Sequence, residues 1–507
     1  MEFLRIDGNS LTLEDIILVS REGVPVVLTE EASSKVGRSR EVVDTFVDQG
    51  KVVYGITTGF GKFSDVLISK EEAKQLQKNL IMSHACGVGE PLPEETVRAV
   101  MLLRANALSK GFSGVRLDTI QILLDMLNKG VHPVIPEKGS LGASGDLAPL
   151  SHMVLVMIGE GEAYYEGRRL AGREAMERAG ISPIELTSKE GLGLINGTQV
   201  MTAIGALCVA DAITLLKTAD IAGSMTLEAL RGITDAFDPR VHQLRPHIGQ
   251  MHSAANVRKI IQDSDRTTRQ GEVRVQDAYT LRCIPQIHGA SWDAVQFAKE
   301  KIEIEINAVT DNPLIFADKQ DAISGGNFHG QPVALAFDLL GIALAEIANV
   351  SERRIERLVN PQLSELPAFL TRKGGLHSGF MIAQYSAAAL VSENKVLAHP
   401  ASVDSIPSSA NQEDHVSMGT IGARKARSIL WNAQQVVGVE LMAACQAIDL
   451  GEANQLGKGS AAAHEILRQH VTMLEDDRIL YRDMEKCAHL VRSGDVVKEV
   501  ERVVGAL

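Results

Sequence analysis

At 507 residues the chain can bury a large core and exceeds the usual size of a single domain. Its hydrophobic fraction of 45% and charged fraction of 23% are ordinary for a water-soluble globular protein. The net charge of −13, without a long Lys/Arg run, argues against a general nucleic-acid-binding protein. Neither the charge nor the composition identifies a substrate.

The sequence predicts a cytoplasmic protein with no membrane span and no structural metal. The N-terminus is acidic where an export signal would be apolar. The longest apolar run, 200–216, contains Asp211 and lacks flanking cations, which favours a buried core helix. The cysteines form no CxxC pair, which fits a reducing compartment and argues against structural zinc; they are Cys86, Cys208, Cys283, Cys445 and Cys487.

In chain order, residues 1–69 are predicted to mix short β-like runs with turns, for example at 51–56. Apolar residues recurring at i, i+3 and i+4 then predict helices at 70–85, 94–110 and 117–128. Residues 160–190 are predicted to form a small irregular or β insertion. Longer helical patterns follow at about 197–232, 330–360, 379–398 and 419–449.

Helices approaching thirty residues indicate a mainly α protein built as an elongated multi-helix bundle. We therefore expect an N-terminal region at 1–195 that is smaller and mixed, and a long-helix bundle at 196–507. Polar, non-periodic stretches separate the helices at 263–286, 310–330 and 400–417. Long segments of this kind inside a compact protein are typically binding loops.

The tripeptide Ala143-Ser144-Gly145 lies in a turn-rich segment between two apolar stretches. Because Gly145 has no Cβ, its amide nitrogen can approach the Ala143 carbonyl carbon closely. Attack by that nitrogen and loss of water would close an imidazolone ring. Loss of the Ser144 hydroxyl as a second water would leave a conjugated C=C, an electrophile. The alternative is an ordinary turn in which Asp146 caps a following helix.

Three other patterns fail as ligand sites. The glycine-rich segment 55–62 has Ile56 and Phe63 where a phosphate loop needs Gly and Ser/Thr. The segment from His464 to Arg468 breaks HExxH at its last position. The remaining candidate histidines are five residues apart, out of register for a helical metal site; they are His242, His247 and His252.

The segment that begins at the tripeptide resembles the signature of the aromatic amino-acid ammonia-lyases: Gly142-Ala143-Ser144-Gly145-Asp146-Leu147-Ala148-Pro149-Leu150-Ser151-His152. The resemblance extends from Tyr54 to at least Met418, with every motif in family order. It implies that Ala-Ser-Gly becomes 4-methylidene-imidazol-5-one (MIO), supported by Asp146, with no diffusible cofactor. It also implies the helical fumarase/aspartase-like architecture and a homotetramer whose active sites each take residues from more than one subunit.

By the same resemblance, Tyr54 is the base that takes the Cβ proton, and its pKa must be lowered for that role. Asn196 lies beside the MIO ring, although by position alone it could cap a helix. Arg282 holds the substrate carboxylate and Tyr279 lies near the ring and the amine. With Gln276, these two residues have a spacing of three and three, which predicts one helical face. The remaining implied contacts are Asn312, to the carboxylate, and Phe328, against the ring.

Two positions bear on the substrate. Ser83-His84 matches the family members that act on histidine, and Glu413 stands where the phenylalanine enzymes carry Gln. An imidazole has two polar nitrogens, which a histidine side chain and a carboxylate can satisfy. The sequence therefore predicts deamination of L-histidine to urocanate and ammonia. The alternatives are a tyrosine or phenylalanine ammonia-lyase, an aminomutase, or a non-catalytic helical scaffold whose loop is not cyclised.

Overall fold

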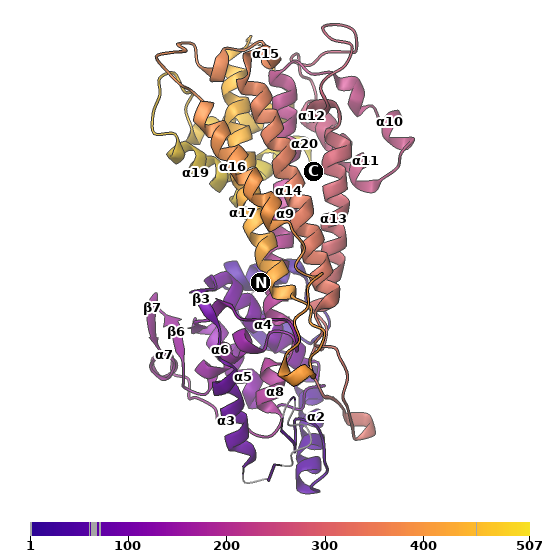
Figure 1. The fold of residues 1–507 in the computed structure, drawn as a ribbon, viewed down its shortest axis with the longest axis vertical. Helices are drawn as coiled ribbons and strands as arrows, with labels where there is room; N and C mark the ends of the chain where they lie inside the picture. Colours follow the sequence, from indigo (N-terminus) through magenta and orange to yellow (C-terminus); the bar gives the residue numbers. More distant parts are fainter. Residues whose placement is uncertain (1–2, 60, 62–67, 70–71, 453) are drawn as a thin grey trace. The chain divides into compact units, whose positions relative to one another are not determined.

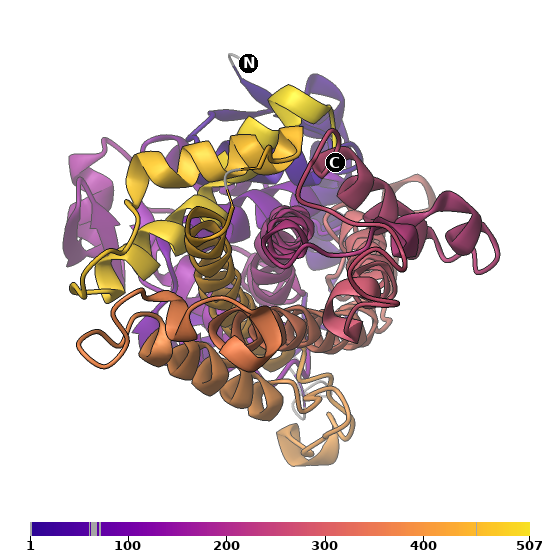
Figure 2. The same cartoon turned by 90° about the horizontal axis from the view of Figure 1, so that it is seen from above.

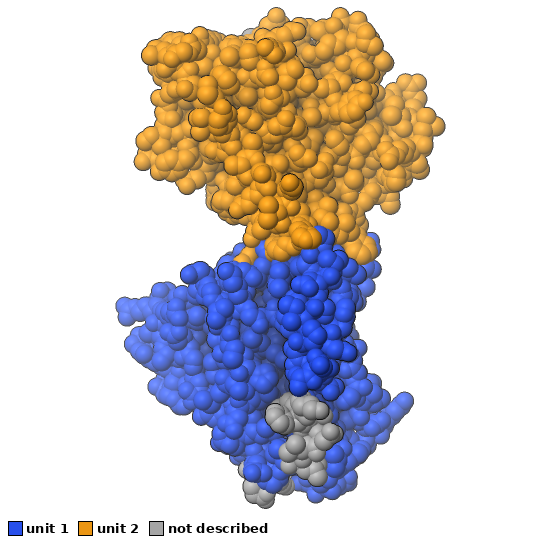
Figure 3. All heavy atoms as spheres, viewed as in Figure 1, with its two compact units in different colours: residues 1–207, 299–337, 400–424 blue, residues 208–298, 338–399, 425–507 orange. Residues whose placement is uncertain are grey.

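The computed structural model describes residues 3–59, 61, 68–69, 72–452 and 454–507. Most of these residues are helical, which confirms the predicted fold class (Figure 1). The chain forms two compact units (Figure 3), and neither unit is continuous in sequence. Unit 1 contains residues 1–207, 299–337 and 400–424; unit 2 contains 208–298, 338–399 and 425–507. The sequence-based division into 1–195 and 196–507 did not anticipate the two later segments of unit 1.

Unit 1 combines short helices with small sheets. Its helices are α1 (Leu13–Arg21), α2 (Glu30–Asp48), α3 (Ala73–His84), α4 (Glu94–Ser109), α5 (Leu117–Asn128), α6 (Leu147–Met157), α7 (Gly172–Arg178) and α8 (Glu190–Ile195). Strands β1 (Leu4–Ile6) and β2 (Val26–Leu28) pair in parallel. The other pairs are antiparallel: β3 (Val88–Pro91) with β5 (Pro136–Lys138), β6 (Glu162–Tyr165) with both β4 (His132–Pro133) and β7 (Arg168–Ala171), and β8 (Leu314–Phe316) with β9 (Asp321–Ile323).

Four long helices carry the chain through both units: α9 (Gln199–Ala229), α13 (Ile284–Glu305), α14 (Gln331–Val359) and α17 (Gly419–Leu450). The other helices of unit 2 are α10 (Pro239–Gln243), α11 (Ile248–Ile260), α12 (Tyr279–Arg282), α15 (Pro361–Ser364), α16 (Met381–Leu397), α18 (Lys458–His470), α19 (Tyr481–Ser493) and α20 (Asp495–Val504). Seen from above, the unit 2 part of α9 lies among the other helices of that unit (Figure 2). Within unit 2, α9 is apolar and buried on most sides, which is typical of a central bundle helix.

Of the described helices, α9 and α14 are long and apolar enough to cross a membrane by length and composition alone. However, 78% of the most apolar window of α9 and 67% of that of α14 are buried within the protein. Core helices pass the same length and composition test, so this is weak evidence for a membrane span. The burial of α9 agrees with the core helix predicted for 200–216.

The β-like prediction for the first 69 residues is wrong over much of its length. Helix α1 begins with a capping box in which the Thr12 hydroxyl accepts from the Asp15 amide and the Asp15 carboxylate accepts from the Thr12 amide. Helix α2 buries Val36, Val43 and other residues at helical spacing, a period that the β reading overlooked. Residues 51–53 have no regular structure and 54–57 form a turn, in which Gly55 has a φ of +66° and the Ile56 amide donates to the Val53 carbonyl.

The later helix predictions are confirmed to within a few residues by α3, α4, α5, α9, α14, α16 and α17. The predicted start of the first of them, Lys70, lies outside the described residues, as do Lys62 and Phe63. The insertion at 160–190 contains the predicted β structure as the β6–β7 hairpin. It also contains α7, which the sequence did not predict.

Candidate active site

The Ala143-Ser144-Gly145 loop is clamped against the turn that follows α8. Gly145 has a φ of +70°, and a Cβ at this position would lie 2.1 Å from the Gly197 carbonyl oxygen. The next residue, Asp146, donates its amide to that same oxygen at 2.7 Å. Only glycine fits a position with this φ and this contact. The requirement for Gly145 therefore follows from the backbone of Gly197 as well as from the ring chemistry.

Ser144 has a partner on each of its oxygens. Its Oγ donates to Glu413 Oε1 at 3.1 Å, and its carbonyl oxygen accepts from Asn196 Nδ2 at 2.9 Å. The side-chain NH2 of Asn196 therefore donates to the Ser144 carbonyl. The amides of Val200 and Met201 at the start of α9 donate to Asp146 and not to Asn196, which argues against the helix-capping alternative.

Asp146 caps a helix, but the helix is α9 and not α6, which follows Asp146 in the chain. Its Oδ2 accepts from the amides of Val200 at 3.0 Å and Met201 at 2.9 Å. Its Oδ1 accepts from the hydroxyls of Ser140, at 2.8 Å, and Thr420. Burial raises the pKa of Asp146, and these four donors oppose that effect. The fully buried carboxylate thus ties the loop to α9 and α17.

A cavity of about 1120 Å³ in unit 1 opens above this loop. It brings together seven of the residues predicted from sequence: Tyr54, His84, Ser144, Asn196, Asn312, Phe328 and Glu413. The sequence analysis missed several further lining residues, among them Asn79, Leu192 and Gln412. Asn79 lies four residues before Ser83 on α3, and both line the cavity, so helical periodicity could have identified it.

Tyr54 reaches the cavity from a turn, and its hydroxyl accepts from the Gly61 amide at 3.2 Å. Burial raises its pKa and the Glu413 carboxylate raises it further, whereas the Gly61 amide lowers it. The net direction within one chain is upward, opposite to what a base needs. The lowered pKa expected from the sequence therefore requires a cation or substrate beyond these groups.

His84 and Glu413 face the same cavity from different segments. His84 ends α3, its Nδ1 lies 3.0 Å from Ser83 Oγ, and burial lowers its pKa, which favours the neutral imidazole. Glu413 is fixed by Ser408, whose hydroxyl donates to Oε2 at 2.9 Å. The backbones of Ser408 and Glu413 also exchange two hydrogen bonds. The sequence analysis did not identify Ser408.

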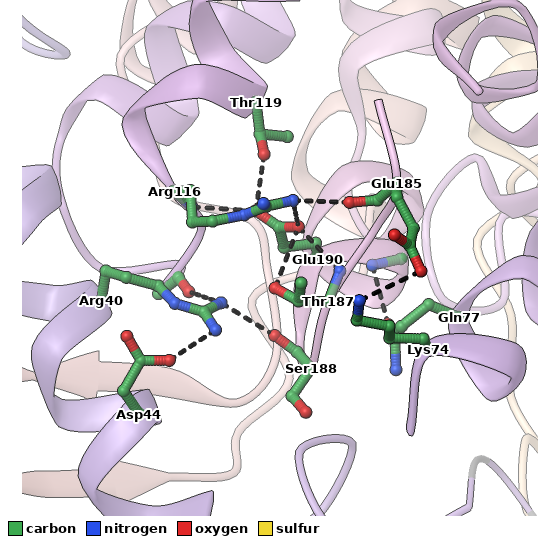
Figure 4. A network of polar contacts seen from close by, with 12 residues as sticks. Arg40, Asp44, Lys74, Gln77, Arg116, Thr119, Glu185, Thr187, Ser188 and Glu190 are labelled. Atoms are coloured by element: carbon green, nitrogen blue, oxygen red, sulfur yellow. Dashed lines mark hydrogen bonds and ion pairs between the residues drawn. The ribbon is translucent and has the colours of Figure 1, made fainter. Parts of the chain in front are cut away.

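A buried network fixes α8, the helix that leads into Asn196 (Figure 4). At its N-terminal end, Glu190 accepts from Arg116 at 2.6 Å and from the Thr119 hydroxyl at 2.5 Å. Burial tends to raise the pKa of Glu190, but these bonds outweigh it and hold the pKa below its usual value. Gln77 on α3 accepts from the Gly191 amide at 2.8 Å. The network thus joins α3, which carries His84, to α8, which ends just before Asn196.

Asn312 and Phe328 line the cavity from the segment 310–330, which was predicted to be a binding loop. Asn312 Oδ1 accepts from the Gly325 amide at 2.8 Å. Its own amide donates to Asp311 Oδ1 at 2.6 Å, and Asp311 pairs with Lys189 at 2.6 Å, with both of these side chains buried. A buried ion pair therefore supports the backbone from which Asn312 projects.

Gln276, Tyr279 and Arg282 belong to unit 2 and are not among the residues that line this cavity. Tyr279 is 69% exposed, and the Arg282 guanidinium lies 4.6 Å from its ring centre. Helix α12 begins only at Tyr279, because Asp277 bonds the Ile233 amide and Ala278 is extended. Gln276 precedes the helix, so the prediction that all three share one helical face is wrong for Gln276.

Among the described residues, no group of three or more His, Cys, Asp or Glu side chains is arranged to hold a metal ion. The polar side chains that line the cavity, among the residues that the structure describes, are hydroxyls, amides, an imidazole and the carboxylate of Glu413, and Leu, Ile and Phe side chains line much of the rest. These groups can bind a polar amino acid, move a proton and donate hydrogen bonds to a developing anion.

Comparison with known proteins identifies the family. The aromatic amino acid lyase family model matches residues 11–469. The chain belongs to this family. It is 68% identical over 504 residues to the histidine ammonia-lyase of Alkaliphilus oremlandii, with 99% of each chain covered. The lyase family model and the identity to this ammonia-lyase together show that the chain is a carbon–nitrogen lyase.

Solved structures of the family share the fold. The histidine ammonia-lyase of Trypanosoma cruzi is 43% identical with a TM-score of 0.92, covering 98% of this chain and 95% of its own. The tyrosine aminomutase of Streptomyces globisporus is 39% identical with a TM-score of 0.95, and 99% of each chain is covered. Since both enzymes fit the fold closely, the architecture alone does not select the reaction. The substrate has to be argued from the residues of the cavity.

Proposed function

We propose that the protein deaminates L-histidine to trans-urocanate and ammonia, using an MIO group formed from Ala143-Ser144-Gly145. The observation that supports this most directly is the pair His84 and Glu413 at the cavity that holds Ser144. A neutral imidazole and a carboxylate can bond both ring nitrogens of histidine. A phenylalanine ring would leave these groups unpaired in the cavity, which disfavours it strongly.

The residues around the loop fit the MIO group. Ring closure joins the Gly145 nitrogen to the Ala143 carbon, and the Ala143 oxygen leaves as water with the amide hydrogens of Ser144 and Gly145. The Ser144 Oγ leaves as a second water with its own hydrogen and the Ser144 Cα hydrogen. The clamp on Gly145 favours the bent loop, and the Asn196 amide lies on the Ser144 oxygen. When formed, the group supplies an electrophilic carbon that ordinary side chains lack.

The chain's own residues bind the substrate and move its protons. Asn196 Nδ2 donates to the Ser144 oxygen, on which negative charge develops when the loop acts as an electron acceptor. Tyr54 takes the Cβ proton once a nearby cation lowers its pKa. Asn312 and Arg282 bind the substrate carboxylate, and the forked guanidinium suits that role. Phe328 packs against the ring, while Glu413 and His84 orient it.

We further propose a cytoplasmic homotetramer in which Gln276, Tyr279 and Arg282 reach each cavity from a second copy of the chain. Support comes from the position of these residues outside the cavity-lining set and from the exposure of Tyr279. A cation supplied by another copy would also lower the pKa of Tyr54, which the groups of one chain raise. Co-expression of Tyr54→Phe with Arg282→Ala tests this, because mixed tetramers then regain some intact sites. Failure to recover activity would exclude sharing between copies.

Two measurements test the proposed function. Intact mass should be about 36 Da below the encoded chain, the mass of two water molecules. Incubation with histidine, tyrosine and phenylalanine, followed by the absorbance of the conjugated acrylate, should show turnover of histidine only. An unmodified mass would favour a scaffold with an uncyclised loop. Tyrosine turnover without histidine turnover, or formation of a β-amino acid, would support a tyrosine lyase or an aminomutase instead.

A further inference from the structure

Arg104 lies in the middle of α4, a helix that is buried on every side from Thr96 to Ser109. The Arg104 side chain is fully buried, and its neighbours along the helix are apolar. Burial lowers its pKa to about 10, so the guanidinium still carries its charge at neutral pH. A buried cation is costly unless its donors are satisfied. Its partners therefore indicate what the charge is used for.

The hydrogen-bond acceptors of Arg104 in the described part of the chain are neutral oxygens of one short segment. Nη1 donates to the Asn196 carbonyl at 2.9 Å and to Gln199 Oε1 at 2.7 Å. Nη2 donates to the Gly193 carbonyl at 2.7 Å and again to the Asn196 carbonyl at 3.0 Å. The planar fork of one arginine thus fixes the end of α8 and the start of α9 together.

This segment is the one that contacts the Ala143-Ser144-Gly145 loop. Asn196 bonds the Ser144 oxygen, and the Gly197 carbonyl packs on Gly145 and accepts from the Asp146 amide. Gly197 also leaves room for the arginine, because a Cβ there would lie 2.7 Å from Arg104 Nη1. Arg104 therefore contacts both residues that bond or pack against the tripeptide, Asn196 and Gly197.

The other end of α8 is fixed independently by Glu190, Arg116 and Gln77 (Figure 4). With α8 fixed at both ends, the turn after it has little freedom to move away from Gly145. Removing Arg104 would release the carbonyls of Gly193 and Asn196 while leaving the Glu190 network in place. The effect on the loop can therefore be separated from the anchoring of α8.

We infer that Arg104 is a positioning residue for the double dehydration of Ala143-Ser144-Gly145, acting through Asn196 and Gly197. The inference rests on the proposed MIO chemistry. Ring closure requires the Gly145 nitrogen to reach the Ala143 carbon, and the Gly197 carbonyl restrains the backbone at that point. Without Arg104 the turn relaxes, so the ring closes more slowly, and the Asn196 amide is less well placed during turnover.

The test compares Arg104→Gln with Arg98→Gln. Arg98 lies on the same helix, is 8% exposed and also donates to backbone carbonyls, those of Val19 and Leu127. Its Nη1 also lies 3.0 Å from His132 Nε2, and within the described part of the chain none of these partners is hydrogen-bonded to the tripeptide. After a pulse of expression, intact mass gives the fraction of folded chains that have lost two waters at each time. Circular dichroism and thermal unfolding report the folding of both variants.

We expect the tripeptide to lose its two waters at least about tenfold more slowly in Arg104→Gln than in wild type. In Arg98→Gln this rate should stay within about twofold of wild type, although both substitutions lower thermal stability. Turnover per dehydrated chain should also fall in the Arg104 variant alone. If Arg104→Gln does not accumulate as folded protein, Arg104→Lys is measured; it keeps the charge, loses the fork and should still lose water more slowly. Loss of water at the wild-type rate in a folded Arg104 variant, or equal slowing by Arg98→Gln, would overturn the inference. If wild type itself shows no mass loss, the MIO proposal fails instead.

Discussion

Each unit contains a fully buried arginine, and the two differ in what they bond. Arg104 in unit 1 bonds backbone carbonyls and one amide oxygen. Arg354 in unit 2 bonds the buried carboxylate of Glu440 through Nε and, at 2.9 Å, through Nη2. Its Nη1 lies 3.2 Å from His288 Nε2, and His288 Nδ1 lies 2.7 Å from Asp220. Because arginine can only donate, the geometry places Nε2 of His288 as the acceptor and Nδ1, which faces Asp220, as the donor.

The unit 2 cluster joins side chains that lie on four helices, α9, α13, α14 and α17. Each charged group there has a charged or polar side-chain partner, so the cluster specifies how the helices pack. The Arg104 cluster instead specifies the path of a turn. The same residue type thus serves helix packing in one unit and backbone geometry beside the candidate site in the other.

The largest effect is expected at Ser144, whose hydroxyl has to leave in the proposed ring chemistry. Ser144→Ala removes the hydroxyl that leaves as the second water, so no methylidene carbon can form. We expect turnover of histidine to fall by about 10³-fold or more, while helix content stays unchanged. Steady-state kinetics, intact mass and circular dichroism check this. Wild-type turnover by the variant would be incompatible with the proposed chemistry.

In unit 2 we expect the opposite pattern: the protein loses stability, but the tripeptide still loses its two waters. Arg354→Met leaves the Glu440 carboxylate buried without its cation, which costs about 3–5 kcal/mol. The thermal midpoint should fall clearly, while the folded fraction still shows the loss of two waters. Thermal scans and intact mass provide the measurements. A variant that unfolds like wild type, or that fails to dehydrate while folded, would remove the distinction between the two arginines.

The Glu190 network allows a further test, because it is a charged cluster like that of Arg354 but fixes α8, which leads into the turn at Asn196 and Gly197. Because the folded pKa of Glu190 lies below its usual value of 4.5, the carboxylate stabilises the fold above that pH. This contribution is lost as the pH falls through the lower folded pKa. Glu190→Gln should cost about 3 kcal/mol at neutral pH and flatten the acid side of the stability profile.

The matched control for Glu190 is Glu185→Gln. Its carboxylate pairs with Lys74, but the Glu185 side chain is 71% exposed, so we expect little change. Denaturant midpoints measured from pH 3 to pH 7 would separate the two variants. An unchanged acid branch in Glu190→Gln would show that this carboxylate does not control acid stability.

The smallest expected effect is at Glu413, which acts on the substrate and not on the fold. Glu413→Gln should lower kcat/KM for histidine by about 100-fold, equivalent to about 2.7 kcal/mol, with no change in thermal midpoint. Asp414→Asn changes the exposed neighbouring carboxylate and should leave both quantities unaltered. Equal kinetics for the two variants would remove Glu413 from ring recognition.

Much of the fold was predictable because helical periodicity is local. The long helices follow from apolar residues repeating every three or four positions, and their bounds matched the structure closely. The early helices α1 and α2 were missed although their N-caps, Thr12 and Thr29, are clear signals of helix starts. The failure at 51–56 arose because a β-rich composition occurs there in a segment that turns at Gly55.

Residues of the candidate site could be predicted only where they lie in a sequence motif that resembles the family. His84, Asn196, Asn312 and Glu413 were identified this way, and the structure brings them to one cavity. Arg104 and Ser408 were not identified, because their partners lie far away in sequence or in a short loop with no periodic pattern. A charged residue inside the apolar helix 94–110 was the available signal for Arg104.

The sequence alone determined the helices and the reactive tripeptide, because helix periodicity and ring chemistry depend on neighbouring residues. The tertiary structure determines which groups surround that tripeptide. Gly197 packs against Gly145, Asn196 donates to the Ser144 carbonyl, and Arg104 bonds the Asn196 carbonyl. These contacts join residues about 50 to 90 positions apart, and no local preference specifies them. They arise only when buried polar groups must find partners inside a packed core.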